Sequence, residues 1–184
     1  IGLTRQEQDE SKSLDDNTEG TIFSLNKYLH LLMKGNPTVF EIAFANEKFH
    51  QETTVEGLEI CRFVRTHFIT KHLFKPYSAY FRAQQRELNN TKRVGKRLEL
   101  VKKYGYETKF ARHAARLGYQ CIELMDTGTL NPTLEGVERE ICFAIKSGAY
   151  PLHRVNDILS ILDKDMYSAY NESKLPAHPN FDAI

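Results

Sequence analysis

Hydrophobic residues recur at helical spacing along most of the chain, so the sequence predicts a largely helical protein. Leu25, Leu29 and Leu32 share one face of a first helix, which Ser24 can cap and Gly35 can end. Further helices or helical turns are expected at about 37–44, 54–69, 76–90, 107–126, 133–146 and 153–172. No internal repeat interrupts this order.

Residues 19–24 (EGTIFS) are rich in β-formers and predict one short strand. The expected fold class is therefore α+β and predominantly helical. Composition suggests three parts, which are an acidic lead-in over 1–18, a short segment over 19–50 and a helical region over 51–184. The last part contains a basic connector at 91–106 and ends in a proline-containing tail.

The composition is that of a globular protein. The 184 residues are 41% hydrophobic with a net charge of +1, which is enough for one packed core and excludes a disordered chain. No apolar run approaches the roughly 18 residues of a membrane helix, so no membrane association is expected. The three cysteines form no CxxC pair, which argues against a disulfide framework or a thiolate zinc site and favours a cytoplasmic location.

The charge is distributed unevenly along the chain. Residues 1–20 hold six acids and two bases, whereas residues 82–116 hold eleven bases and three acids. A basic block of this kind is typical of proteins that bind a polyanion, either a nucleotide or a nucleic acid. A solvated lysine-rich loop between two helices would give the same composition, and both interpretations stay open.

Within the basic block, one predicted helix gathers its polar residues on a single face. Lys109, His113, Arg116 and Gln120 fall at i, i+4, i+7 and i+11 beside an apolar stripe. Arginine offers a planar fork to phosphate and lysine a point charge, so this stripe is the best candidate for phosphate binding. The alternative is an ordinary amphipathic helix with a solvated basic face.

Five segments, in order, resemble a family of nucleotidyltransferases in the DNA polymerase β superfamily that is named for an RNA repair pathway. They are Glu19-Gly-Thr-Ile-Phe-Ser-Leu-Asn-Lys-Tyr-Leu with Leu31-Leu-Met-Lys-Gly-Asn-Pro-Thr-Val-Phe-Glu41, Phe74-Lys-Pro-Tyr-Ser-Ala-Tyr-Phe-Arg-Ala-Gln84, Lys109-Phe-Ala-Arg-His113-Ala-Ala-Arg116, Ile145-Lys-Ser-Gly-Ala-Tyr-Pro-Leu and Ser173-Lys-Leu-Pro-Ala-His-Pro. The resemblance covers about 19–180. It implies that 19–50 is the remainder of a nucleotidyltransferase core, and that 19–24 is an edge of its sheet.

The chain departs from this superfamily at its catalytic motifs. None of the ten glycines is followed by serine, and the only Asp-x-Asp, Asp163-Lys-Asp165, lies in a predicted helix as a solvated face. Two Mg²⁺ ions need several converging carboxylates, which one acid does not supply. The expectation is either the C-terminal portion of a longer enzyme or a degenerate copy. If Glu19 matches the family's third carboxylate, its implied role is catalytic base or metal ligand; otherwise it is a surface acid.

The resemblance implies an enzyme that moves a nucleoside monophosphate from a triphosphate to an acceptor hydroxyl with Mg²⁺. Lys109, His113 and Arg116 are then expected to bind the nucleotide phosphates, and Lys27 either approaches them or lies in solvent. RNA or another polyanion is the expected partner of residues 82–116. The alternative is a non-catalytic helical module that binds nucleic acid or a partner protein.

Overall fold

The computed structural model describes residues 10–15, 18–46, 48, 52–88 and 96–179, and for residues 10–22, 96 and 97 it describes the backbone only. Its elements, in order, are β1 (Glu10–Asp15), β2 (Thr18–Ile22), α1 (Leu25–Met33), α2 (Pro37–Phe44), α3 (Val55–His67), the 3-10 turn η3 (Lys71–Leu73), α4 (Phe74–Glu87), α5 (Lys96–Tyr104), α6 (Thr108–Thr127), α7 (Gly136–Ser147) and α8 (Leu152–Glu172). The prediction of a predominantly helical protein is confirmed.

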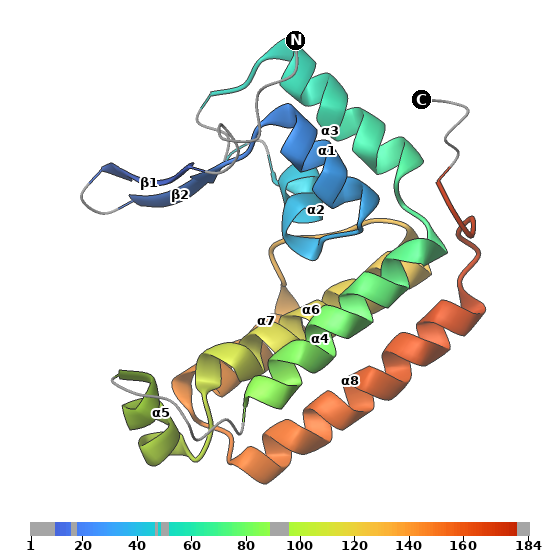
Figure 1. Cartoon of the computed structure of the whole chain (residues 1–184). Coiled ribbons are helices and arrows are strands. Elements are labelled where there is room, and N and C mark those ends of the chain that lie inside the picture. The colour runs from blue at the N-terminus through green and yellow to red at the C-terminus, as the bar shows by residue number, and fades with distance from the viewer. Residues whose placement is uncertain (1–9, 16–17, 47, 49–51, 89–95, 180–184) are drawn as a thin grey trace.

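The centre of the fold is α6, which packs against α4, α7 and α8 (Figure 1). Gly118 of α6 permits this close approach. A Cβ atom there would lie 3.2 Å from Leu162 of α8 and 3.3 Å from Phe81 of α4. Both neighbours are themselves buried, so they have little room to yield. The helices on either side of α6 therefore enclose one continuous apolar core.

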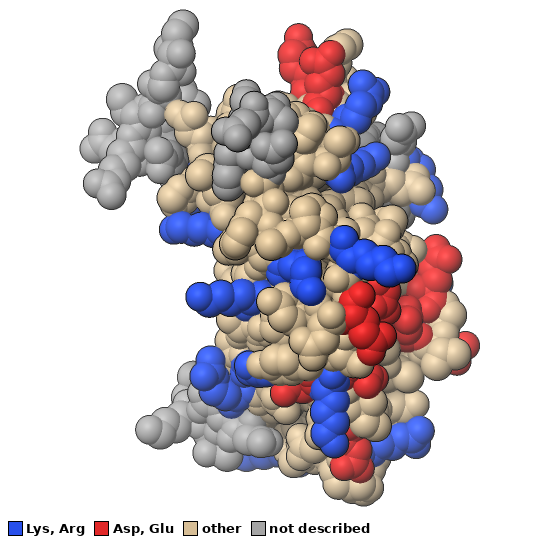
Figure 2. All heavy atoms as spheres, turned by 90° about the vertical axis from the view of Figure 1, so that its right-hand side faces the viewer, with Lys and Arg blue, Asp and Glu red and all other residues tan. Residues whose placement is uncertain are grey.

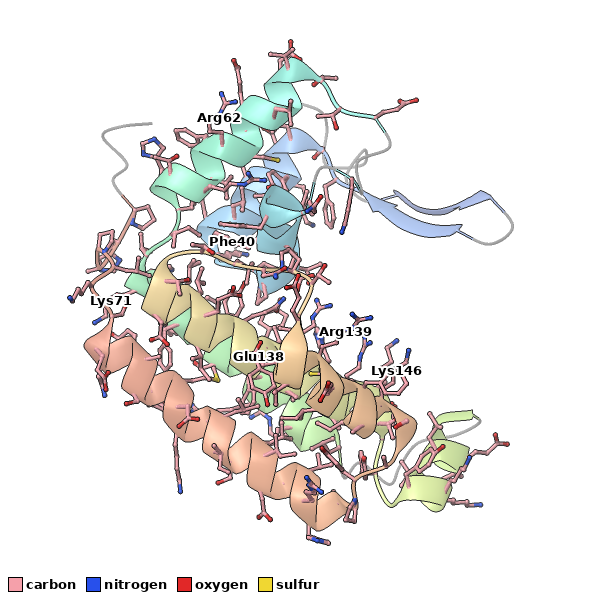
Figure 3. The ribbon with its side chains drawn as sticks, turned by 180° about the vertical axis from the view of Figure 1, so that it is seen from behind. Phe40, Arg62, Lys71, Glu138, Arg139 and Lys146 are labelled. Atoms are coloured by element: carbon pink, nitrogen blue, oxygen red, sulfur yellow. The ribbon has the colours of Figure 1, made fainter. Side chains whose placement is uncertain are left out.

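The helices α1, α2 and α3 cover one end of this bundle (Figure 1). Local sequence signals set their beginnings, since Ser24 Oγ accepts a hydrogen bond from Lys27 N and Asn36 Oδ1 accepts one from Thr38 N. Phe40 of α2, labelled in Figure 3, is fully buried in the common core. The N-terminal helices are thus joined to the bundle by apolar contact.

A β-hairpin extends away from the helices (Figure 1). A strand was expected at 19–24. The structure has β2 at 18–22, and this strand pairs antiparallel with β1. Among the described residues β2 pairs with no other strand, so they do not show it as the edge of a larger sheet. No strand was expected in the acidic lead-in, but β1 occupies 10–15. Its sequence, ESKSLD, gave no strand signal because it is polar and its backbone pairing with β2 is not local.

The prediction of a connector over 91–106 was wrong for its second half, which forms α5. The apolar residues Leu98, Val101 and Tyr104 recur at every third position and are half-buried, while Lys102 and Lys103 are exposed. The sequence did not indicate this helix clearly, because its few apolar residues stand among many charged ones. The helix is held at its end by Tyr104, whose ring contacts the backbone at Gly148. Residues 91–95 lie outside the described part of the chain.

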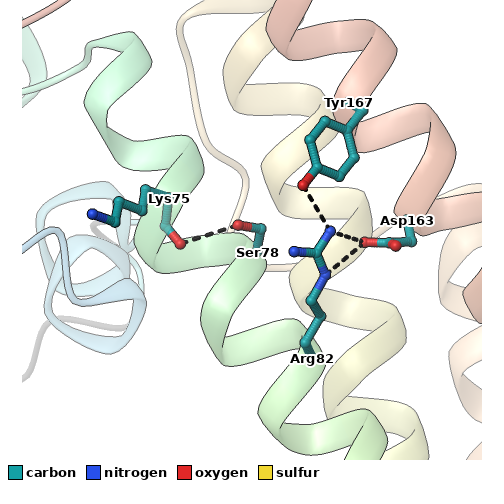
Figure 4. A network of polar contacts seen from close by, with 5 residues as sticks. All are labelled: Lys75, Ser78, Arg82, Asp163 and Tyr167. Carbon is teal, nitrogen blue, oxygen red and sulfur yellow. Dashed lines mark hydrogen bonds and ion pairs between the residues drawn. The ribbon is translucent and has the colours of Figure 1, made fainter.

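The last helix is joined to α4 by a polar network (Figure 4). Arg82 donates to Asp163 Oδ1 from Nε (3.2 Å) and from Nη2 (2.9 Å), and also to the hydroxyl of Tyr167 (3.0 Å). Asp163 is therefore occupied by a contact between helices, and Asp165 lies exposed on α8 as predicted. On the face of the molecule where α8 lies, acidic side chains cluster on the right-hand side of the view, whereas basic ones lie along the left-hand edge and also among the acids (Figure 2).

The three cysteines are free, as the sequence predicts. Cys121 and Cys142 are buried in the core, and burial raises the pKa of Cys121 to about 12 and that of Cys142 to about 11. Both therefore stay protonated at neutral pH and act as small apolar residues.

Candidate phosphate-binding site

A basic groove runs between α6 and α7. It has a volume of about 690 Å³, and its basic lining residues are Arg112 and Arg116 of α6 with Arg139 and Lys146 of α7. Figure 3 shows Arg139 and Lys146 projecting from the same side of α7, while Glu138 lies on the other side. Among the described residues that line this groove, Glu140 is the one acid. The excess of positive charge makes the groove suited to an anion with several charges.

Helical spacing explains why these cations face one another. Arg112 and Arg116 are four residues apart on α6, and Arg139 and Lys146 are seven residues apart on α7, so each pair lies on one helix face. The buried Cys142 also lines this groove, and together with the buried Ile145 it packs α7 against the core. Packing of α7 on α6 then brings the two basic faces to a single groove.

Arg116 has a second role as a link to the N-terminal helices. Its guanidinium donates to Glu41 Oε1 of α2, and Gln120 Nε2 donates to the same oxygen at 3.1 Å. Gln120 is fully buried, and the side chains of Arg116 and Glu41 are only 28% and 19% exposed. Buried polar atoms without a partner lie around this link, namely Arg116 Nε, Gln120 Oε1 and the hydroxyl of Tyr77. The charge of Arg116 is thus partly compensated before any ligand binds.

The polar stripe predicted on α6 is not one solvent-facing surface. Lys109 is exposed at the start of the helix, His113 is half-buried and Gln120 is fully buried. The α2 helix covers the end of the stripe that holds Arg116 and Gln120, which sequence spacing on α6 alone does not reveal. Of the predicted phosphate ligands, Arg116 lines the groove and Lys109 and His113 do not.

The other predicted site residues lie elsewhere. Lys27 is half-buried on α1 and does not line the groove between α6 and α7. The backbone of Glu19 lies in β2 opposite Ser13, and its side chain is outside the described part of the structure. The predicted catalytic and metal-binding role of Glu19 therefore remains a prediction.

The carboxylates that the structure describes do not converge on a magnesium site. Within those residues no group of three or more His, Cys, Asp or Glu side chains is placed to hold a metal ion. Glu41 is bound by Arg116, and Asp163 by Arg82. The described residues do not fit the two-metal site that the family resemblance implies.

His113 is expected to be neutral at pH 7 because burial and the nearby Arg116, Arg112 and Lys109 lower its pKa to about 4. The unfolded chain takes up this proton near pH 6.5 and the folded chain only near pH 4. The contribution of neutral His113 to the free energy of unfolding is therefore complete above about pH 6.5 and declines as the pH falls toward 4.

The measurement is thermal unfolding between pH 4 and 7, with His113 followed by NMR. His113→Gln should flatten this part of the profile, because glutamine does not titrate. A His113 pKa of 6 or above would contradict the expectation.

Sequence reasoning missed Arg112, Arg139 and Lys146. Arg139 and Lys146 belong to a segment with net negative charge, residues 132–184, which hides a local basic face. The spacing of Arg139, Phe143 and Lys146 at i, i+4 and i+7 was the available signal, because it puts an aromatic ring between two cations on one side of a helix.

A comparison with family models matches residues 1–159 to the RNA repair pathway DNA polymerase beta family. No curated protein and no solved structure matches the chain. None of the helices in the described part of the chain has the length and apolar character needed to cross a membrane. The match covers most of the chain and includes four of the five sequence segments, whereas the fifth, residues 173–179, lies beyond it. The chain therefore belongs to the RNA repair pathway DNA polymerase beta family, and at family level it is a polymerase-β-like nucleotidyltransferase.

Proposed function

We propose that this protein transfers a nucleoside monophosphate from a nucleoside triphosphate to an acceptor hydroxyl with Mg²⁺, and that the groove between α6 and α7 binds the triphosphate. The observation that carries this proposal is the convergence of Arg112, Arg139 and Lys146 with Arg116 on one groove. Charge-assisted hydrogen bonds from guanidinium groups to phosphate are among the strongest in proteins. The requirement for Mg²⁺ and the role of Glu19 rest on the family alone.

An exposed aromatic ring favours a nucleotide over a simple phosphate. Phe143 lines the same groove between Arg139 and Lys146, and it is 69% exposed. A nucleobase stacked on an aromatic side chain gains about 1–3 kcal/mol. We therefore propose that the base of the nucleotide stacks on Phe143 while its phosphates contact the arginines.

Calorimetric titration of the full chain with ATP, tripolyphosphate and inorganic phosphate tests this proposal. ATP should bind most tightly. Arg139→Ala and Arg112→Ala should each weaken ATP binding about tenfold or more, which corresponds to the roughly 1.5–3 kcal/mol of a hydrogen bond to a charged group. Arg62→Ala is the matched control, because Arg62 is exposed on α3, far from the groove (Figure 3).

Incubation with labelled nucleoside triphosphates and Mg²⁺ then tests the transfer to RNA or protein acceptors. Label on an acceptor, lost in Arg139→Ala and kept in Arg62→Ala, supports the proposal. Equal affinity for every polyanion with no transfer would favour the alternative, a helical module that binds nucleic acid without catalysis.

A further inference from the structure

A second groove adjoins the basic groove between α6 and α7. It has a volume of about 550 Å³ and is lined by the end of α2, the start of the following loop, α3 and the loop that joins α6 to α7. Pro132 and Thr133 line both grooves, so the two meet at this loop. A ligand in the second groove therefore lies directly beside one bound between α6 and α7.

The lining of the second groove is rich in hydrogen-bond donors. Lys48 and Arg65 supply two cations against Glu135. Asn46 Oδ1 accepts from Lys48 N at 3.0 Å, and Asn131 Oδ1 accepts from Thr133 N at 2.9 Å. Both amide oxygens are therefore engaged within their own loops. The ammonium and guanidinium donors match the oxygens of phosphate groups.

We propose that this second groove binds the sugar–phosphate backbone of a single-stranded nucleic acid and brings its end to the groove between α6 and α7. The inference rests on the proposed function, since it identifies the acceptor that would receive the nucleotide. A volume of about 550 Å³ lies within the range of small-ligand sites and suits one or two nucleotides of one strand. Phe44 also lines the groove, and the Arg65 guanidinium lies 5.6 Å from the centroid of its ring.

The proposal is tested by fluorescence anisotropy of the full chain with labelled single-stranded RNA, single-stranded DNA and duplex oligonucleotides of equal length. Single strands should bind more tightly than the duplex. Lys48→Glu should weaken single-strand binding about tenfold, and Lys48→Ala should reduce the slope of log K against log salt by about 0.7, as expected for one lost phosphate contact on a single strand.

Lys164→Glu is the matched control for charge reversal, because Lys164 is exposed on α8 and lines neither groove. Arg65 also donates from Nε to the Ala43 carbonyl, so Arg65→Ala is compared with wild type by thermal unfolding before its binding is interpreted. Asn131→Asp provides a second probe, because it adds an anion to the groove in nearly the same shape and should weaken single-strand binding.

The readouts separate this inference from the proposed function. Lys48→Glu should leave ATP affinity unchanged, whereas Arg139→Ala should lower it. Binding of single-stranded RNA or DNA that depends on Lys48 supports the inference, whether or not ATP binds, and preference for RNA would indicate contact with the 2′-hydroxyl. Tighter binding of the duplex, or equal loss in Lys48→Glu and Lys164→Glu, would overturn it.

Discussion

Replacing Glu41 with alanine is expected to lower the free energy of unfolding by about 3 kcal/mol. Glu41 Oε1 accepts hydrogen bonds from Arg116 and Gln120, and the substitution leaves both donors in a largely buried place without an acceptor. Removing one partner of a buried ion pair costs about 3–5 kcal/mol, and the partial exposure of Arg116 brings the expected value to the lower end. Urea unfolding measures the change.

The matched control for Glu41→Ala is Asp163→Ala. The Arg82–Asp163 bridge also joins two helices, but its side chains are 40% and 35% exposed. Exposed ion pairs contribute about 0–1 kcal/mol, so this variant should lose little stability. In a double-mutant cycle, Glu41 and Arg116 should show a coupling energy of about 1–3 kcal/mol. Equal losses in Glu41→Ala and Asp163→Ala would show that burial does not decide the strength of these bridges.

Replacing Gly148 with alanine is expected to cost about 3 kcal/mol of stability. Gly148 ends α7 with φ +72°, a left-handed conformation that costs other residues about 1–2 kcal/mol. In addition, the new Cβ would overlap the ring of Tyr104, and overpacking of this kind costs about 1–3 kcal/mol. Thermal unfolding of the variant gives the magnitude.

Gly136→Ala separates the two causes. Gly136 also has a positive φ, +54°, but a Cβ there meets no atom within 4 Å. Its substitution should cost about 1 kcal/mol for the backbone conformation alone. Adding Tyr104→Ala to the Gly148→Ala variant removes the ring that the new Cβ would overlap, so it should recover part of the lost stability. Similar costs at Gly148 and Gly136 would argue against the contact between α5 and the end of α7.

The helices were predictable because their signals are local. Ser24 and Asn36 cap their helices as the sequence indicates, and Gly128 and Gly148 end α6 and α7 in left-handed conformations. The prediction of a basic connector failed at α5, because few apolar residues stand among many charges there. A helix with so weak a period depends on a tertiary contact, here that of Tyr104, which no local pattern encodes.

The site was less predictable because its contacts join distant parts of the chain. The basic character of α6 was visible in the sequence, and so was Arg116 as a candidate. Its partner Glu41 lies 75 residues away, and nothing local relates the two. For the same reason the sequence did not indicate that Arg139 and Lys146 of α7 face Arg112. These side chains line one groove only because α7 packs against α6.

The packing of α6 also bears on how this groove tolerates substitution during evolution. Neighbouring helices surround α6, and even Gly118 has no room for a methyl group without displacement. By contrast, Val137, Arg139 and Phe143 of α7 are exposed, so their replacement disturbs no core. Variation on α7 can therefore retune the ligand preference of the groove at little cost in stability, while α6 is held nearly constant. Differences in ligand preference among related proteins should accordingly map to α7.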